Sequence, residues 1–166
     1  MMVFPSQFRK PHRLKGFDYS SACSYMITFV TAQRKKILSL IQQNNIYEPP
    51  SVLLTEYGKI CEKHILRIPH VYPGVFIDNY VIMPDHIHLL ITISRSGGDD
   101  KKTVPVSTII HATKRMITRE IGKSIWQLDF HDVIADNEKR YDICDRYIDD
   151  NPASWLMDKE PPLLFQ

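Results

Sequence analysis

Two histidines separated by a single residue, His86 and His88, are the side chains best placed to do chemistry. They lie in the mostly apolar run VIMPDHIHLLI of residues 81–91. On a β-strand alternate side chains share a face, so the two imidazoles project together, with Cα atoms roughly 6.7 Å apart at a rise of ~3.3 Å per residue. Burying them without partners would cost roughly 1–3 kcal/mol each. The pair is therefore either a metal-binding pair or two core histidines bonded to the backbone.

A tyrosine and an asparagine near the C-terminus form the second chemical feature. Tyr147 and Asn151 stand in the segment YIDDNP of residues 147–152, and residues four apart lie on the same face of a helix. A phenol beside an amide oxygen offers a nucleophile together with a hard metal ligand. The same tyrosine also fits a core stripe with Cys144 and Ile148, so packing alone is the other interpretation of this position.

The elements that must position these residues follow from hydrophobic periodicity and helix-capping signals. The sequence predicts strands at residues 25–31, 75–83 and 86–94, and helices at residues 56–68, 105–121 and 137–151. Thr55 is the expected cap of the first helix, while Pro69, Gly122 and Pro152 are the expected ends of the three helices.

Two stretches carry no strand or helix prediction. One contains Asn44, Asn45, Pro49 and Pro50, which break regular structure, and the other is an aromatic connector at residues 126–134. The remaining order, β-α-β-β-α with one further helix, predicts an α+β fold. We expect a ferredoxin-like antiparallel sheet with helices packed on one face.

Length and charge indicate one domain with an uneven charge distribution. The 166 residues fit a single domain, with a basic N-terminal arm at residues 1–20 and a C-terminal tail at residues 153–166. Residues 1–126 carry 17 Lys+Arg against 9 Asp+Glu, whereas residues 127–166 carry 4 against 10. A basic body with an acidic end favours a protein that binds a polyanion.

Several classes of protein are disfavoured by composition. No run approaches the length of an apolar membrane helix, and the N-terminus has no apolar signal core. Three widely spaced cysteines, Cys23, Cys61 and Cys144, fit reduced thiols better than a disulfide framework. We therefore expect a cytoplasmic protein without a membrane partner.

Taken together, six segments make the chain resemble a known family. They are RLKGFDY (13–19), YMITFVT (25–31), LTEYGK (54–59), NYVIMPDHIH (79–88), IWQ (125–127) and YIDDNP (147–152). The chain resembles the HUH single-tyrosine transposases, and among them the REP-associated tyrosine transposases. The resemblance implies that His86 and His88 bind metal, that Tyr147 is the catalytic tyrosine, and that Asn151 completes the metal site. It also implies an antiparallel sheet with helices packed on it.

The resemblance implies an activity and a partner. Members of the family bind single-stranded DNA, often at the foot of a hairpin, and cut and rejoin it. We therefore expect a metal-dependent single-stranded DNA endonuclease and transposase that forms a 5′-phosphotyrosine intermediate at hairpin or palindromic repeat sequences. Imidazole and amide-oxygen ligands suit Mg²⁺ or Mn²⁺. The protein is expected to act as a monomer or a homodimer.

DNA contacts are expected from basic side chains, through phosphate neutralisation, and from one aromatic side chain, through base stacking. The candidates are Arg9, Lys10, Arg13, Lys15, Arg34, Lys35, Lys114, Arg115 and Trp126.

The chain departs from the family pattern near both chemical features. Asp85 stands where the family usually has Asn; its carboxylate could hydrogen-bond an imidazole or repel DNA. Asp145, Asp149 and Asp150 place negative charge around Tyr147, which disfavours a phosphate backbone unless a metal or basic residues offset it.

Two alternative functions stay open at this point. The first is a catalytically inactive single-stranded nucleic-acid-binding module on the same fold, in which the histidines are structural. The second is a zinc hydrolase in which Tyr147 only packs. Replacing Tyr147 by Phe separates the nuclease from the binding module, and identification of the metal separates the nuclease from the hydrolase.

Overall fold

The computed structural model describes residues 23–45, 47–94 and 104–157. The strands are β1 (Cys23–Val30), β2 (Ser39–Gln42), β3 (Ser51–Leu54), β4 (Val75–Ile82), β5 (His86–Ile93) and β6 (His131–Ala135). The helices are α1 (Glu56–Val71), α2 (Val106–Ile121) and α3 (Glu138–Met157), and a short 3-10 turn, η2 (Ala32–Arg34), follows β1.

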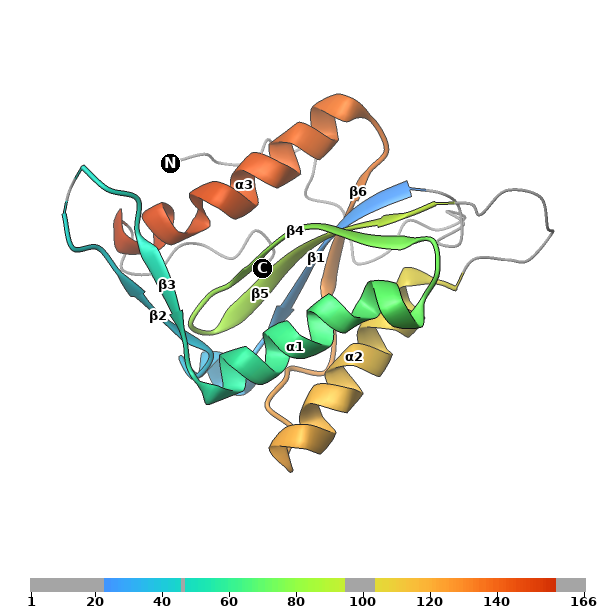
Figure 1. The fold of residues 1–166 in the computed structure, drawn as a ribbon, viewed down its shortest axis with the longest axis horizontal. Coiled ribbons are helices and arrows are strands. Elements are labelled where there is room, and N and C mark those ends of the chain that lie inside the picture. The colour runs from blue at the N-terminus through green and yellow to red at the C-terminus, as the bar shows by residue number, and fades with distance from the viewer. Residues whose placement is uncertain (1–22, 46, 95–103, 158–166) are drawn as a thin grey trace.

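A four-stranded antiparallel sheet in the order β4-β5-β1-β6 forms the centre of the molecule (Figure 1). Strand β5, which carries both histidines, lies between β4 and β1 and is paired along both of its edges. In this register His88 lies opposite Thr28, and His86 lies opposite Val30. Strands β2 and β3 form a separate two-stranded hairpin.

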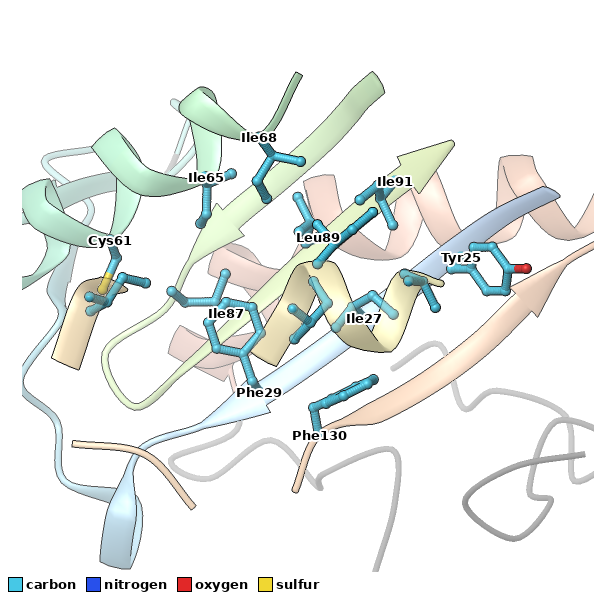
Figure 2. Close-up of a cluster of buried hydrophobic side chains, with 14 of the residues drawn as sticks. Tyr25, Ile27, Phe29, Cys61, Ile65, Ile68, Ile87, Leu89, Ile91 and Phe130 are labelled. Atoms are coloured by element: carbon cyan, nitrogen blue, oxygen red, sulfur yellow. The ribbon is translucent and has the colours of Figure 1, made fainter. Parts of the chain in front are cut away.

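Alternation along the strands divides the core between the two faces of the sheet. Tyr25, Ile27 and Phe29 of β1 project to one face, where they pack with residues of α1 and α2. Figure 2 shows this cluster, with Cys61 and Ile65 of α1 lying over the sheet. Burial of these aliphatic and aromatic side chains is the main stabilising contribution to this side of the fold.

Helix α3 covers the other face. Met26 of β1 and Leu90 of β5 pack there against Cys144 and Ile148 of α3. The α+β class and the antiparallel sheet expected from the sequence are confirmed, with one difference. Helices lie on both faces of the sheet, α1 and α2 on one and α3 on the other (Figure 1), whereas the sequence pattern placed them on one face.

Two expected connections contain strands. Residues Ser39–Gln42 and Ser51–Leu54 pair as the β2–β3 hairpin around the stretch that carries Asn44 and Pro49. Residues His131–Ala135 form the edge strand β6 within the expected aromatic connector. These strands are only four or five residues long, so their periodicity is too short to predict them, and tertiary pairing decides their conformation.

Two prolines do not end their helices as predicted. Helix α1 continues past Pro69 to Val71, and α3 continues past Pro152 to Met157. Proline inside a helix removes one backbone hydrogen bond and crowds the preceding turn, but packing can outweigh that cost. Pro152 itself is buried, and residues 153–157 of the expected C-terminal tail belong to α3.

Two further findings bear on the class of protein. Within the described ranges, no helix is long and apolar enough to cross a membrane. Cys23, Cys61 and Cys144 are all unpaired thiols.

Candidate active site

His86 and His88 both project from β5 toward α3, because they have the same parity as Leu90 on that strand. Their ring centroids lie 4.7 Å apart, and the two residues are only 3% and 2% exposed. The sequence-based prediction that the two imidazoles share one face of a strand is confirmed.

The Nδ1 atom of each ring is held by a neighbouring side chain. His88 Nδ1 lies 2.7 Å from the Thr28 hydroxyl of β1, and His86 Nδ1 lies 2.6 Å from Oδ1 of Asp85. These two contacts fix the orientation of both imidazole rings. Burial, reinforced by neighbouring His86, holds the pKa of His88 well below its ordinary value. His88 is therefore neutral, the form in which an imidazole binds a metal.

Asp85 is a buried carboxylate that links His86 to a basic residue. Its second oxygen accepts a hydrogen bond from Arg34 Nε at 3.0 Å, and the residue is 2% exposed. Although burial opposes the change, the hydrogen bonds and charges of His86 and Arg34 lower the pKa of Asp85. The carboxylate thus orients the imidazole. Arg34, expected to contact DNA, is already engaged with this carboxylate.

The turn that delivers Asp85 and His86 is fixed by backbone hydrogen bonds. Thr31 donates to the Asp85 carbonyl through both its N–H, at 2.9 Å, and its hydroxyl, at 3.0 Å. The Leu38 N–H donates to the Pro84 carbonyl at 3.0 Å. Two chain segments outside β5 therefore hold the turn in place.

Arg34 reaches Asp85 from an unusual backbone conformation. Gln33 and Arg34 have φ angles of 56° and 52°, in the left-handed region that residues other than glycine seldom adopt. Such conformations cost free energy and persist where the surrounding structure requires them. The turn at Gln33 and Arg34 is held by the ion pair between Arg34 and Asp85 and by the hydrogen bonds from Thr31 to the Asp85 carbonyl.

Helix α3 brings Tyr147 against His88, and Asn151 lies one turn further along the same helix. The Tyr147 ring lies 5.1 Å from the His88 ring, centroid to centroid. Burial raises the pKa of Tyr147 to about 12, partly offset by a hydrogen bond from Asn151. Asn151 is 2% exposed, and among the described residues its Oδ1 atom has no hydrogen-bond partner.

This donor set fits a divalent cation. Two imidazole nitrogens and one amide oxygen are established ligand types, and an unpaired buried carbonyl oxygen is costly unless something binds it. No group of three His, Cys, Asp or Glu side chains that could hold a metal occurs in the part of the chain that the structure describes. The Asn151 oxygen is the additional donor that α3 offers beside the two histidines.

Two residues beside this group were not expected from the sequence. Trp155 of α3 lies 6.1 Å from His86, between ring centroids, and Lys36 Nζ lies 5.3 Å from the centroid of the Trp155 ring. Trp155 is four residues beyond Asn151, so helical spacing could have identified it. The sequence does not predict this contact, because Pro152 is the expected end of the helix.

The acidic residues of α3 are partly engaged elsewhere. Asn79 of β4 donates to Asp145 at 2.7 Å and to Asp149 at 2.9 Å. Asp150 lines a surface pocket together with Glu48, which lies between β2 and β3. Two of the three carboxylates near Tyr147 in sequence are thus held at the β4 edge.

The expected DNA contacts are placed very differently by the structure. Lys114 is 7% exposed and donates to the backbone carbonyls of Gln127, Leu128 and Asp129 at 2.8–3.2 Å, so its prediction as a phosphate contact is corrected to a structural role. Trp126, also 7% exposed, packs edge-on against Phe29 and is not available for base stacking.

Of the other predicted DNA contacts, some lie within the described residues and some outside them. Lys35 is exposed beside the Asp85 turn, and Arg115 is exposed on α2, on the far face of the sheet from Tyr147. The predictions for Arg9, Lys10, Arg13 and Lys15 fall outside the described residues.

Comparison with known proteins supports the fold. No protein-family model matches the chain. An uncharacterized protein of Haemophilus influenzae is 28% identical over 174 residues, which cover 91% of this chain and 92% of that protein. A solved structure of a REP-associated tyrosine transposase bound to a REP hairpin superposes with a TM-score of 0.63 at 22% identity, covering 89% of this chain and 77% of that one. The chain therefore shares the fold of that transposase, which confirms the expected resemblance at the level of the fold.

Proposed function

We propose that this protein is a divalent-metal-dependent nuclease and transposase that cuts and rejoins single-stranded DNA through Tyr147. The observation that carries the proposal is the interface between β5 and α3. There the Tyr147 ring lies 5.1 Å from the His88 ring, and the buried Asn151 oxygen, one helical turn further on, has no partner among the described residues. A nucleophile and a set of metal donors thus occupy one interface.

The proposed metal ligands are His86 Nε2, His88 Nε2 and Asn151 Oδ1. A bound Mg²⁺ or Mn²⁺ ion would polarise a non-bridging oxygen of the scissile phosphate. Imidazole nitrogens favour Mn²⁺ over Mg²⁺, which prefers oxygen ligands. Thr28 and Asp85 hold the two Nδ1 atoms, so both rings are oriented before any ligand arrives.

The covalent step belongs to Tyr147. Its phenolic oxygen attacks the phosphorus, a new O–P bond forms, and the bond from phosphorus to the 3′-oxygen breaks. The electron pair leaves with the 3′-oxygen, which takes up the proton that the phenol released. The product is a 5′-phosphotyrosine and a free 3′-hydroxyl. Attack by the 3′-hydroxyl of another strand reverses the same step and joins the DNA.

Burial and one hydrogen bond act in opposite directions on the Tyr147 phenol. Burial raises its pKa to about 12, so the phenol is protonated at neutral pH, whereas the hydrogen bond from Asn151 lowers that pKa by favouring the phenolate. Asn151 therefore serves both as a metal ligand and as a partner of the nucleophile.

The proposed substrate is single-stranded DNA at a hairpin or palindromic repeat. The structural neighbour with the same fold was solved bound to a REP hairpin. Exposed basic residues beside the Asp85 turn, including Lys35, supply positive charge near the site.

A labelled pool of single-stranded hairpins, incubated with Mn²⁺ and the full chain, tests the proposal. On a denaturing gel we expect a protein-linked label that disappears in Tyr147→Phe. The matched control is Tyr141→Phe, on the same helix, because Tyr141 bonds Asp78 instead of lining the site. A label that persists in Tyr147→Phe would defeat the proposal, as would equal loss in both variants.

A second candidate is a binding module that uses the same surface without cutting DNA. The observation that favours it is the burial of Tyr147, whose pKa of about 12 makes the phenol a weak nucleophile at neutral pH. This candidate predicts retention of hairpins on a native gel, in wild type and Tyr147→Phe alike, with no covalent product under any metal.

A further inference from the structure

The last turns of α3 carry a tryptophan that the proposed cleavage step does not use. We infer that Trp155 and Lys36 form a binding site for one unpaired nucleotide of the DNA strand, next to the phosphate that Tyr147 attacks. The indole stacks on the base, and the Lys36 ammonium contacts the phosphate. The inference rests on the proposed function for the course of the strand, and it adds contact residues that the cleavage chemistry does not require.

Helical spacing sets Trp155 beside the reacting centre but outside it. Tyr147, Asn151 and Trp155 follow one another at intervals of four residues on α3. At ~1.5 Å rise per residue, Trp155 lies about 12 Å beyond Tyr147 along the helix. On β5 the order is matched, since Tyr147 contacts the ring of His88 and Trp155 lies near the ring of His86. A strand that runs along α3 from Tyr147 toward His86 would present a nearby nucleotide to Trp155.

The surroundings of the indole are those of a single-strand contact. Trp155 is partly exposed, unlike Trp126, and Lys36 Nζ lies 5.3 Å from the centroid of its ring. Surfaces that bind unpaired DNA combine aromatic faces with cations that follow the backbone. Here one aromatic face and one exposed ammonium lie together at the edge of the site.

Local charge favours phosphate at this end of the site. The turn after β1 carries Arg34, Lys35 and Lys36, of which Arg34 neutralises the carboxylate of Asp85. Lys35 and Lys36 are exposed. The helix carboxylates Asp145 and Asp149 are bonded instead to Asn79, on β4.

Tryptophan emission of the full chain, titrated with oligo(dT) in EDTA, tests the inference without any cleavage. The chain has two tryptophans, and Trp126 is 7% exposed, so DNA should alter mainly the Trp155 emission. We expect quenching in the wild type and its loss in Trp155→Phe. Trp155→Leu, which removes the aromatic ring, should weaken oligo(dT) binding about tenfold.

A salt series isolates the contribution of Lys36. Lys36→Gln should reduce the slope of log K against log salt by about 0.7, the value for one phosphate contact on a single strand. The matched control is Lys123→Gln, because Lys123 Nζ lies 5.6 Å from the centroid of the Tyr57 ring in the same type of contact. Tyr57 packs on the α1 face of the sheet, so this control should leave the slope unchanged.

The inference is overturned if oligo(dT) still quenches the emission of Trp155→Phe. It is also overturned if Lys36→Gln and Lys123→Gln have the same salt slope, because Lys36 then only packs on the indole. Circular dichroism of each variant guards against misfolding. The outcome is separable from that of the proposed function. Quenching of Trp155 without any covalent product would contradict the nuclease proposal but support the nucleotide-binding site. A covalent product without quenching of Trp155 would support the nuclease and contradict the binding site.

Discussion

The two histidines differ in the partners that orient them. His88 is held by the Thr28 hydroxyl, whereas His86 is held by a carboxylate, Asp85, that is itself paired with Arg34. A carboxylate bonded to the far nitrogen of an imidazole fixes its tautomer and raises its basicity as a ligand. The carboxylate at position 85 therefore acts on His86, and its burial and its ion pair with Arg34 reduce the repulsion of DNA expected from the sequence.

Asp85→Asn should lower the affinity of the protein for Mn²⁺ by about tenfold or more, because an amide oxygen carries no charge to polarise His86. Isothermal titration calorimetry with Mn²⁺ measures this change directly. Asp78→Asn is the control, since Asp78 is a carboxylate on β4 that bonds Thr92. Unchanged Mn²⁺ affinity in Asp85→Asn would show that the carboxylate has no influence on the site.

Lys114→Met should destabilise the fold by about 3 kcal/mol, because three backbone carbonyls lose a charged donor. Urea unfolding measures the loss. The affinity of the folded variant for single-stranded DNA should stay at the wild-type value, since Lys114 is buried. Weaker DNA binding at wild-type stability would restore the phosphate contact that the sequence predicted.

At the scale of elements, the start of α1 supports the turn that precedes His86. The Thr55 side chain caps α1 by accepting from the Gly58 N–H at 3.2 Å, as predicted. Thr55 also donates to the Leu38 carbonyl through its backbone N–H, and the Leu38 N–H donates to Pro84. A chain of hydrogen bonds thus links a helix on one face to the histidine turn.

Gly58→Ala should break this docking and destabilise the protein by about 3 kcal/mol, because a Cβ at this position would collide with the Leu38 carbonyl oxygen. The change in urea midpoint gives the cost. Gly122→Ala is the comparison: it has a φ of 82° but open space around the added Cβ, so about 1 kcal/mol of backbone strain is expected. Equal costs would mean that close packing at Gly58 is unimportant.

The elements that the sequence predicted are those with long, regular patterns. Strands β1, β4 and β5, and most of α1 and α2, match the expected ranges within about three residues. The sequence predicts that His86 shares a face with His88, and Tyr147 with Asn151, because each pair lies on a single element and its spacing is local. Their approach across the β5–α3 interface depends on topology, which periodicity does not encode.

What the sequence missed depended on packing between distant segments. The β2–β3 hairpin and β6 are short and owe their conformation to pairing. Pro152 is accommodated inside α3, and this extension carries Trp155 to His86. The burial of Lys114 and Trp126 likewise reflects tertiary contacts that cannot be predicted from the residue type. Local sequence signals predict exposure of Lys114 and Trp126 and a helix end at Pro152. Tertiary contacts determine a different outcome at all three positions.

At the scale of the whole molecule, the sheet separates two surfaces. The candidate site lies between the sheet and α3, while α1 and α2 cover the opposite face (Figure 1). Lys35 follows β1 beside the Asp85 turn, whereas Arg115 lies on α2. A strand that reaches Tyr147 runs over the α3 side, so the two basic residues should not contribute equally.

Lys35→Gln should therefore lower the affinity for oligo(dT) and reduce the salt slope by about 0.7, while Arg115→Gln should change neither. Fluorescence anisotropy of labelled oligo(dT) over a range of salt concentrations measures both quantities. A larger effect from Arg115→Gln would place the DNA on the α2 face and separate DNA binding from the candidate site.

The assignment of Tyr147 as the nucleophile can be tested by measuring the mass of the intact protein after incubation with Mn²⁺ and a pool of hairpins, followed by peptide mapping. We predict that the peptide containing Tyr147 carries a DNA fragment linked through its 5′-phosphate. This adduct should be absent when Mn²⁺ is replaced by EDTA. An adduct on another residue would contradict this assignment. So would a protein that binds the hairpins but stays unmodified and cuts none of them.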